Sequence, residues 1–255
     1  DRFQRTIYPF ESIILEEVDI SQNESKPDIP VIKIPISERA KLNLNNKNLL
    51  RMYEWEMSLP LSKDCQQKTK VPAVPLSNQL EKGEFSFRPE FRNYFGHIPE
   101  LKFPQLKVKY QFKFKNEYSG PIELVIEPES IVGDWSIIIN NCKTIGPDDL
   151  DLTQTHVRNS LGFNITPFVE KGENMIQIEV DAHKANHGLQ NPLYLAGDFG
   201  VKEDKNSLDI LVDQKKEGIF ECYKENLIPY YSGVLEYTTE FNLDELTTKD
   251  YVIVE

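Results

Sequence analysis

The chain has 255 residues, 39% of them hydrophobic, and its 41 acidic and 29 basic residues give a formal net charge of −12 at pH 7. This length suits one large domain or two ordinary ones with a buried core. A surface this acidic repels phosphate backbones, and the densest basic run, Lys215–Lys216, is flanked by acids; nucleic-acid binding is therefore not expected. Because no apolar run approaches the roughly 18–20 residues that cross a bilayer, membrane insertion is not expected either.

Both ends of the chain resemble internal sequence. The chain opens at Asp1 with neither an initiator Met nor a signal peptide, and Tyr251–Glu255 is a strand-like run that stops without a turn. A chain that ends inside a strand leaves a sheet edge unpaired. We therefore expect an excerpt from a longer protein.

The first 46 residues hold two strand-like runs, Thr6–Leu15 and Ile29–Ile36, joined by the polar stretch Ser21–Asp28. We assign residues 1–46 to N-terminal strands at the end of a preceding domain.

Residues 47–213 carry the clearest β signals. Apolar residues alternate with polar or charged ones in Val108–Phe114 and again in Met175–Val180, which is typical of half-buried strands. Trp135–Ile139 is the most apolar strand and runs into the turn signal Asn140-Asn141. Further strands are predicted at Leu49–Leu59, Ile122–Glu127 and Ile210–Val212, and a single helical turn at Ile165–Glu170, where Pro167 suits the first turn.

Residues 60–104 differ from this pattern. Six prolines from Pro60 to Pro104 punctuate a segment with little alternation, and aromatic residues cluster between Phe85 and Phe103. A solvated linker rarely holds so many aromatic residues. We therefore predict a long irregular insertion that packs on the domain formed by residues 47–213.

After residue 213, strands are predicted at Ile219–Tyr223, Val234–Leu243 and Tyr251–Val254. We assign residues 214–255 to a linker and the first strands of a second, incomplete sandwich. Many short strands, regular turn signals and 16 prolines together predict an all-β chain built as a β-sandwich.

Three segments stand out in order along the chain. Phe163–Ile178 reads FNITPFVEKGENMIQI, Asn191–Val201 reads NPLYLAGDFGV, and Pro229–Phe241 reads PYYSGVLEYTTEF. With the strand and turn at Ile137–Asn141 before them, they resemble the galactose-binding-like, sugar-binding domains of large glycoside hydrolases of family two and of rhamnosidase type. The third segment is similar to the opening of a second such sandwich.

The first segment also has a physical interpretation. Ile165 and Phe168 are expected to cap the sandwich, and Gly172 is expected to supply a tight turn. Asn174 is expected to bond the backbone of that turn before the last strand.

The resemblance implies a galactose-binding-like jelly-roll sandwich, carrying the long insertion and strands of flanking domains. It also implies a non-catalytic region of a bacterial glycoside hydrolase, soluble and either cytoplasmic or secreted, which packs on the catalytic domain of the same polypeptide and places carbohydrate. Two alternatives stay open: an autonomous carbohydrate-binding module, and an adhesin or scaffold sandwich without sugar chemistry. A complete catalytic centre is not expected, because a glycosidase needs two carboxylates about 5–10 Å apart across a sugar.

Sugar binding on such sandwiches combines an aromatic platform with polar side chains on edge loops, because sugars have apolar ring faces and directional hydroxyls. For Trp135, at the head of an apolar strand, a core position is the competing interpretation. For Asp198, the competing role is to accept backbone hydrogen bonds at a turn. The candidate ligand-binding residues are Trp135, His156, Arg158, Asn159, Tyr194 and Asp198.

An acidic loop follows Gly146-Pro147 and offers hard oxygen ligands at Asp148, Asp149 and Asp151. The resemblance implies structural calcium here, which takes six to eight oxygens and would need backbone carbonyls as well. A solvated acidic loop is the alternative.

Cysteine and histidine spacing predicts no zinc site. Cys65, Cys142 and Cys222 lie far apart and fit neither a zinc motif nor an even disulfide framework, so we expect three isolated thiols. His183 and His187 are four residues apart, but nothing between them favours a helix that would place both on one face.

Overall fold

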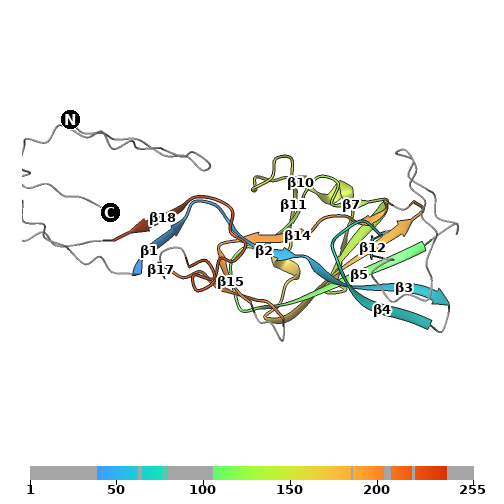
Figure 1. Ribbon diagram of the computed structural model, residues 1–255, viewed down its shortest axis with the longest axis horizontal. Helices are drawn as coiled ribbons and strands as arrows, with labels where there is room; N and C mark the ends of the chain where they lie inside the picture. Colours follow the sequence, from blue (N-terminus) through green and yellow to red (C-terminus); the bar gives the residue numbers. More distant parts are fainter. Residues whose placement is uncertain are drawn as a thin grey trace, which may run out of the picture. The chain divides into compact units, whose positions relative to one another are not determined.

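The computed structural model describes residues 39–62, 65–76, 78–79, 106–184, 186–203, 208–219 and 222–239, and all of them lie in one compact unit, Ile36–Glu255 (Figure 1). Strands dominate these residues, and the sheets are almost wholly antiparallel. The predicted all-β sandwich is confirmed. The strands predicted at Thr6–Leu15, Ile29–Ile36 and Tyr251–Val254 lie outside the described residues, as do the aromatic residues of the predicted insertion.

The larger sheet has eight strands. Its main path runs in the order β15-β16-β5-β12-β8-β9, and β3 joins β5 on one side and β4 on the other. Every pairing is antiparallel except that of β16 with β5. The strands are β3 (Glu54–Ser62), β4 (Cys65–Pro72), β5 (Leu106–Asn116), β8 (Asp134–Ile139), β9 (Lys143–Ile145), β12 (Gly172–Ala182), β15 (Phe199–Lys202) and β16 (Ile210–Asp213).

The second sheet has five strands in the order β10-β11-β6-β14-β2. A small two-stranded sheet, β7 (Ile131–Val132) with β13 (Gly188–Leu189), completes this part of the fold. The five strands are β2 (Asn48–Met52), β6 (Glu123–Ile126), β10 (Asp151–Leu152), β11 (Leu161–Asn164) and β14 (Leu193–Gly197).

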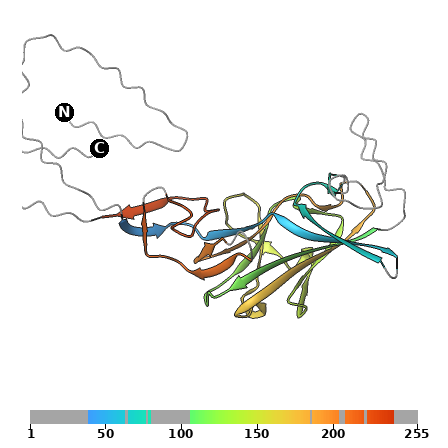
Figure 2. The same cartoon turned by 60° about the horizontal axis from the view of Figure 1, so that its bottom comes forward.

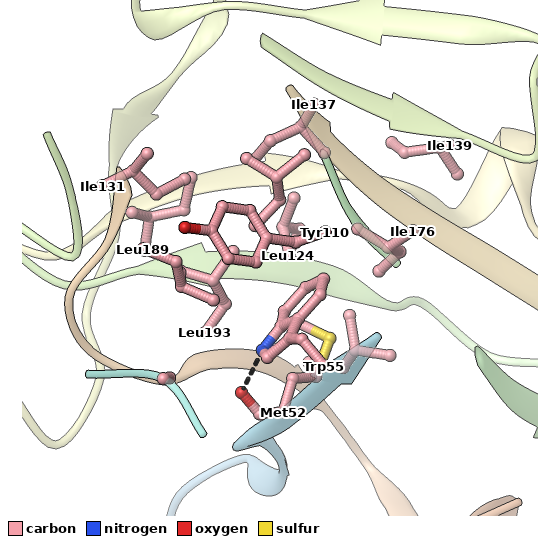
Figure 3. Packing of buried hydrophobic residues seen from close by; sticks show 14 of the residues in the cluster. Met52, Trp55, Tyr110, Leu124, Ile131, Ile137, Ile139, Ile176, Leu189 and Leu193 are labelled. Atoms are coloured by element: carbon pink, nitrogen blue, oxygen red, sulfur yellow. Dashed lines mark hydrogen bonds between the residues drawn. The ribbon is translucent and has the colours of Figure 1, made fainter. Parts of the chain in front are cut away.

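The core lies between these two sheets. Tyr110 and Ile176 of the larger sheet meet Leu124 and Leu193 of the smaller one, all at 0% exposure (Figure 3). The indole of Trp55 is buried among them and donates a hydrogen bond to the Met52 carbonyl at 2.9 Å. Each such side chain contributes about 1.5–3 kcal/mol on burial. The alternation that places them inward therefore fixes which face of each strand turns outward.

The outward face of the larger sheet is a ladder of paired polar side chains. β5 and β12 face each other over their full lengths, from Leu106↔Ala182 to Asn116↔Gly172. On their outer faces Lys109 meets Glu179 at 2.6 Å and Gln111 meets Gln177 at 2.9 Å. Cross-strand pairs of this kind stabilise a sheet that faces water. We infer that this face is solvated.

Asparagine side chains close the turns at one end of the larger sheet. Asn140 and Asn141 have φ of 47° and 56°, so the turn predicted there is confirmed. Asn174 accepts hydrogen bonds from Asn140 Nδ2 at 2.7 Å and from the Glu170 backbone at 2.9 Å, and it donates to the Glu170 and Gly172 carbonyls. The predicted role of Asn174 at this turn is therefore confirmed.

The rest of the segment Phe163–Ile178 also has the conformation predicted for it. Gly172 has a φ of 98°, a conformation that residues with a side chain rarely adopt. Ile165 is fully buried and Phe168 packs against the core. The single predicted helical turn is a 3-10 turn, η2, over Thr166–Phe168.

Three strand predictions need correction. The run Leu49–Leu59 is two strands, because the chain leaves one sheet at Met52 and enters the other at Glu54. The segment from residue 60, predicted to be irregular, begins with the hairpin of β3 and β4, visible as a cyan pair in Figures 1 and 2. The sequence of β4, CQQKTKVP, has almost no apolar residue and therefore no alternation to detect. The strand predicted at Ile219–Tyr223 is β17 (Glu217–Ile219), and Tyr223 lies in a turn.

A three-stranded sheet joins the two ends of the described chain. Its order is β17-β1-β18, with β1 (Arg39–Leu44) between β17 and β18 (Leu235–Thr238) (Figure 1). Asn226, 1% exposed, bonds both the N–H and the carbonyl of Ile219 at 2.8 and 2.7 Å. β1, which lies in the segment assigned to a preceding domain and was not predicted as a strand, therefore shares one sheet with β17 and β18 from the segment assigned to a second sandwich. The proposed domain divisions at residues 46 and 213 stay predictions.

Replacing Asn174 by Ala should lower the free energy of unfolding by about 2–3 kcal/mol, because the change leaves partly or fully buried polar groups without hydrogen-bond partners. Urea denaturation of the wild type, Asn174→Ala and the exposed neighbour variant Glu173→Ala measures this. Equal losses in the two variants would show that the side-chain hydrogen bonds of Asn174 do not stabilise the turn.

Candidate functional site

The outward face of the five-stranded sheet carries a group of apolar side chains, whereas the outward face of the larger sheet carries charged ones. Leu49 of β2, Val125 of β6 and Ala196 of β14 form a second buried cluster, separate from the core, and Tyr194 and Tyr230 pack against it. We call these five residues the tyrosine face. Leu49, Val125 and Ala196 are 0–4% exposed, so they form the floor of this face and the side chains around them form its surface. We take this face as the candidate site.

A histidine and a carboxylate meet on this face. His156 belongs to the loop of residues 153–160, and its Nε2 lies 3.0 Å from Glu127 Oε1. The backbone of His156 faces solvent, yet its side chain and that of Glu127 are each only 18% exposed. The His156 ring also stands edge-on to Tyr194, with ring centroids 4.8 Å apart. The loop is thus held on the sheet by one polar contact and one aromatic contact.

The hydroxyl of Tyr194 joins this pair to an arginine. It interacts electrostatically with Glu127 and with Arg51, which stands opposite Tyr194 in the register of β14 with β2. Burial and then the negative charge of Glu127 raise the pKa of Tyr194, and the Arg51 cation opposes them in part. Tyr194 therefore stays protonated and can donate to Glu127.

Arg51 is itself held between aromatic groups. Its guanidinium lies 4.7 Å from the centroid of the Tyr53 ring, a distance at which a cation is attracted to a π face. Tyr53 is 38% exposed. Arg51 and Tyr53 extend the tyrosine face along β2.

Two further ion pairs lie at the margins of the face. Lys47 contacts Glu123 at 2.9 Å, and Lys224 contacts Glu203 at 3.3 Å. Glu203 also accepts a hydrogen bond of 2.8 Å from the hydroxyl of Tyr230, and burial together with that bond raises the pKa of Tyr230.

The site is shallow. A hollow of about 20 Å³ lies between the loop of residues 153–160 and Ser232, with Lys47, Leu49, His156 and Ala196 in its walls. That volume is about what one water molecule needs. A larger ligand would therefore lie on the surface of the face.

A larger hollow of about 430 Å³ borders β17 and is lined mainly by charged residues of both signs, among them Arg39, Lys216, Glu217 and Glu225. It adjoins residues 220–221, outside the described residues, and contains no predicted site residue. We build no site there.

The structure brings together two of the six predicted ligand-binding residues, His156 and Tyr194. Trp135 lies on β8 in the other sheet and packs against the core, which agrees with its competing interpretation. Arg158 and Asn159 are exposed in the loop, where Asn159 adopts a φ of 61°. Asp198 is exposed at the bend between β14 and β15.

The predicted calcium ligands are spread over two elements. Asp148 and Asp149 lie in a 3-10 turn, η1 (Pro147–Asp149), and Asp151 begins β10. Asp149 Oδ2 accepts the Gly146 N–H at 2.8 Å. Over the part of the chain that the structure describes, no three His, Cys, Asp or Glu side chains form a group that could hold a metal. The three aspartates are thus not gathered as ligands.

The histidines and cysteines, for which the sequence predicts no zinc site, make local contacts or are free thiols. His183 and His187 stand edge-on with centroids 6.1 Å apart, and the His183 backbone N–H points at His187 Nδ1 at 3.3 Å. Cys142 and Cys222 are free thiols.

Sequence reasoning missed Arg51, Tyr53, Glu127 and Tyr230 as parts of one site. The signal was weak because Arg51 and Tyr194 become neighbours only through the pairing of β2 with β14. The alternation of Leu49, Leu50, Arg51 and Met52 does indicate that Arg51 shares a face with Leu49.

No protein-family model matches the chain, and no curated protein matches it. Among solved structures, it is similar to a β-glucuronidase of an uncultured Clostridium species, with a TM-score of 0.39 and 14% identity over 64% of this chain and 32% of that one. It is also similar to a GH2 β-galacturonidase of Eisenbergiella tayi (TM-score 0.38, 10% identity, 66% and 28% covered). A β-D-mannosidase of Dictyoglomus thermophilum gives 0.35 and 15%, with 60% and 24% covered. The chain spans about a third or less of the length of these proteins.

Within the described residues, no helix has the length and apolar character needed to cross a membrane.

Replacing Glu127 by Gln should lower the pKa of Tyr194, because an amide removes the negative charge that opposes the phenolate, while burial keeps the pKa above the ordinary 10.0. The phenolate absorbance of Glu127→Gln minus that of Glu127→Gln/Tyr194→Phe, titrated against pH, isolates this tyrosine. Glu179→Gln on the opposite sheet is the matched control.

The raised pKa of Tyr194 also makes the stability of the fold depend on pH. A raised folded-state pKa gives a contribution that is present below about pH 10 and is lost as pH rises through the folded value. An unchanged Tyr194 titration in Glu127→Gln would show that the charge of Glu127 does not act on Tyr194.

Proposed function

We propose that this chain is a non-catalytic β-sandwich region of a glycoside hydrolase that places carbohydrate on the tyrosine face and packs with the catalytic domain of the same polypeptide. The observation that supports this most is the cluster of Tyr194, His156, Glu127 and Arg51 on one outward sheet face. The ordered sequence segments at Phe163–Ile178, Asn191–Val201 and Pro229–Phe241 support the glycoside hydrolase context.

The chemistry of this face suits a sugar. A pyranose has an apolar ring face, which packs on aromatic side chains, and hydroxyls that need directed donors and acceptors. Tyr53, with 38% of its surface exposed, offers ring surface. Arg51, which is exposed, supplies donors.

The carboxylates of this face are better suited to holding a ligand than to cleaving one. A glycosidase needs one carboxylic acid and one carboxylate free to act on the same bond. Glu127 is paired with His156, Glu123 with Lys47 and Glu203 with Lys224. Placement of carbohydrate is therefore the function that these residues favour over hydrolysis.

The test is a calorimetric and NMR titration of the 255-residue chain with a panel of oligosaccharides. A flat aromatic site should give dissociation constants near the millimolar range, about −4 kcal/mol. Tyr194→Ala should weaken binding at least about 10-fold, because the ring contact is lost. Lys113→Ala, on the outward face of the larger sheet, is the matched control and should bind as the wild type does.

The outcomes separate the alternatives. Micromolar or tighter binding by the chain alone would favour an autonomous carbohydrate-binding module. Absence of binding to every saccharide, or equal binding by Tyr194→Ala and the wild type, would contradict the proposed function and favour a scaffold sandwich.

A further inference from the structure

Among the described residues, the two lysines at the margins of the tyrosine face are paired with carboxylates, whereas Arg51 is not. Lys47 pairs with Glu123, Lys224 with Glu203, and His156 faces Glu127. Arg51 lies among them on β2, and among the described residues no carboxylate lies within 4 Å of its guanidinium. Its polar partner on this face is the neutral hydroxyl of Tyr194.

The chain carries 41 acidic residues against 29 basic ones. A net charge of −12 repels anions at a distance. Any affinity of this face for an anion must therefore come from a local group, and Arg51 is that group.

The guanidinium is also held in place. It extends from a strand whose register sets Arg51 opposite Tyr194, and it lies 4.7 Å from the centroid of the Tyr53 ring. A guanidinium carries five N–H donors. The interaction with the Tyr194 hydroxyl engages at most part of this set, so donors remain for a ligand.

The chemical partner of a free guanidinium fork is a planar carboxylate, which it binds through two parallel, charge-assisted hydrogen bonds. The aromatic surface of Tyr53 and Tyr194 beside it suits a sugar ring. A neutral sugar presents only hydroxyls to the guanidinium, and these are weaker acceptors than a carboxylate.

We propose that Arg51 makes the tyrosine face selective for saccharides that bear a carboxylate, that is, for uronic-acid units over their neutral counterparts. This inference rests on the proposed function, because it names the class of sugar that the same face takes. Arg51 binds the carboxylate, while the tyrosine rings contact the sugar ring.

The experiment uses pairs of ligands that differ only at C6: methyl glucuronide against methyl glucoside, and methyl galacturonide against methyl galactoside. Each is titrated by NMR into the full chain. The wild type should bind at least one uronide about 10-fold more tightly than its neutral partner, the effect expected of a charge-assisted pair. Sodium acetate is a separate arm that tests for a bare carboxylate site.

Arg51→Gln should bring the ratio of uronide to neutral affinity close to 1. Arg51→Lys keeps the charge but loses the planar fork, and should retain only part of the preference. Lys113→Gln removes the same charge from the opposite sheet and should leave the ratio as it is. Arg51 is exposed, so these variants are expected to fold, and their amide spectra check this.

Equal binding of a uronide and its neutral partner by the wild type would overturn this inference while leaving the proposed function standing. A preference that survives in Arg51→Gln, or acetate binding as tight as that of the uronide, would also overturn it. Absence of binding to all four glycosides would contradict the proposed function itself.

Discussion

The register between β5 and β12 is the constraint on which the rest of the structure depends. The two strands pair from Leu106↔Ala182 to Asn116↔Gly172 without a shift, so their even-numbered residues face the core and their odd-numbered residues face outward. A slip of one residue would exchange the two faces. The core would then receive lysines and glutamates. The free-energy cost of burying these charged side chains is far larger than the gain from burying Tyr110 or Ile176.

This constraint also separates the two outward faces of the sandwich. The larger sheet uses its outward positions for matched pairs such as Lys109 with Glu179, which need no partner beyond water. The smaller sheet turns Leu50, Leu124 and Leu195 inward and therefore turns their neighbours outward. Those neighbours include the apolar or aromatic residues Leu49, Val125, Tyr194 and Ala196, and the loop of residues 153–160 is held over them by the contact of His156 with Glu127. The result is a preformed, shallow face that costs little ordering entropy when a ligand binds.

Much of the sandwich could be predicted from the sequence, because alternation is strong where one face is buried. β5, β8 and β12 were predicted within one to three residues of their bounds, as was the turn at Asn140-Asn141. β4 was missed because its sequence, CQQKTKVP, does not alternate apolar with polar residues.

The site was only partly predictable. His156 and Tyr194 were chosen by residue type, and the fold brings them into contact. Arg51 could not be placed beside them, because its position depends on the pairing of β2 with β14, which local sequence does not encode. Trp135 was chosen for its aromatic ring, but it lies on the same face of β8 as Ile137 and Ile139 and therefore points toward the core.

The most direct measurement of where the sandwich meets carbohydrate is a map of amide chemical-shift changes across the full chain on titration with methyl galacturonide. If the tyrosine face is the binding face, the changes concentrate in β2, β14 and the loop of residues 153–160. Changes confined to the outward positions of β5 and β12, or to the acidic turn at Asp148–Asp151, would contradict it.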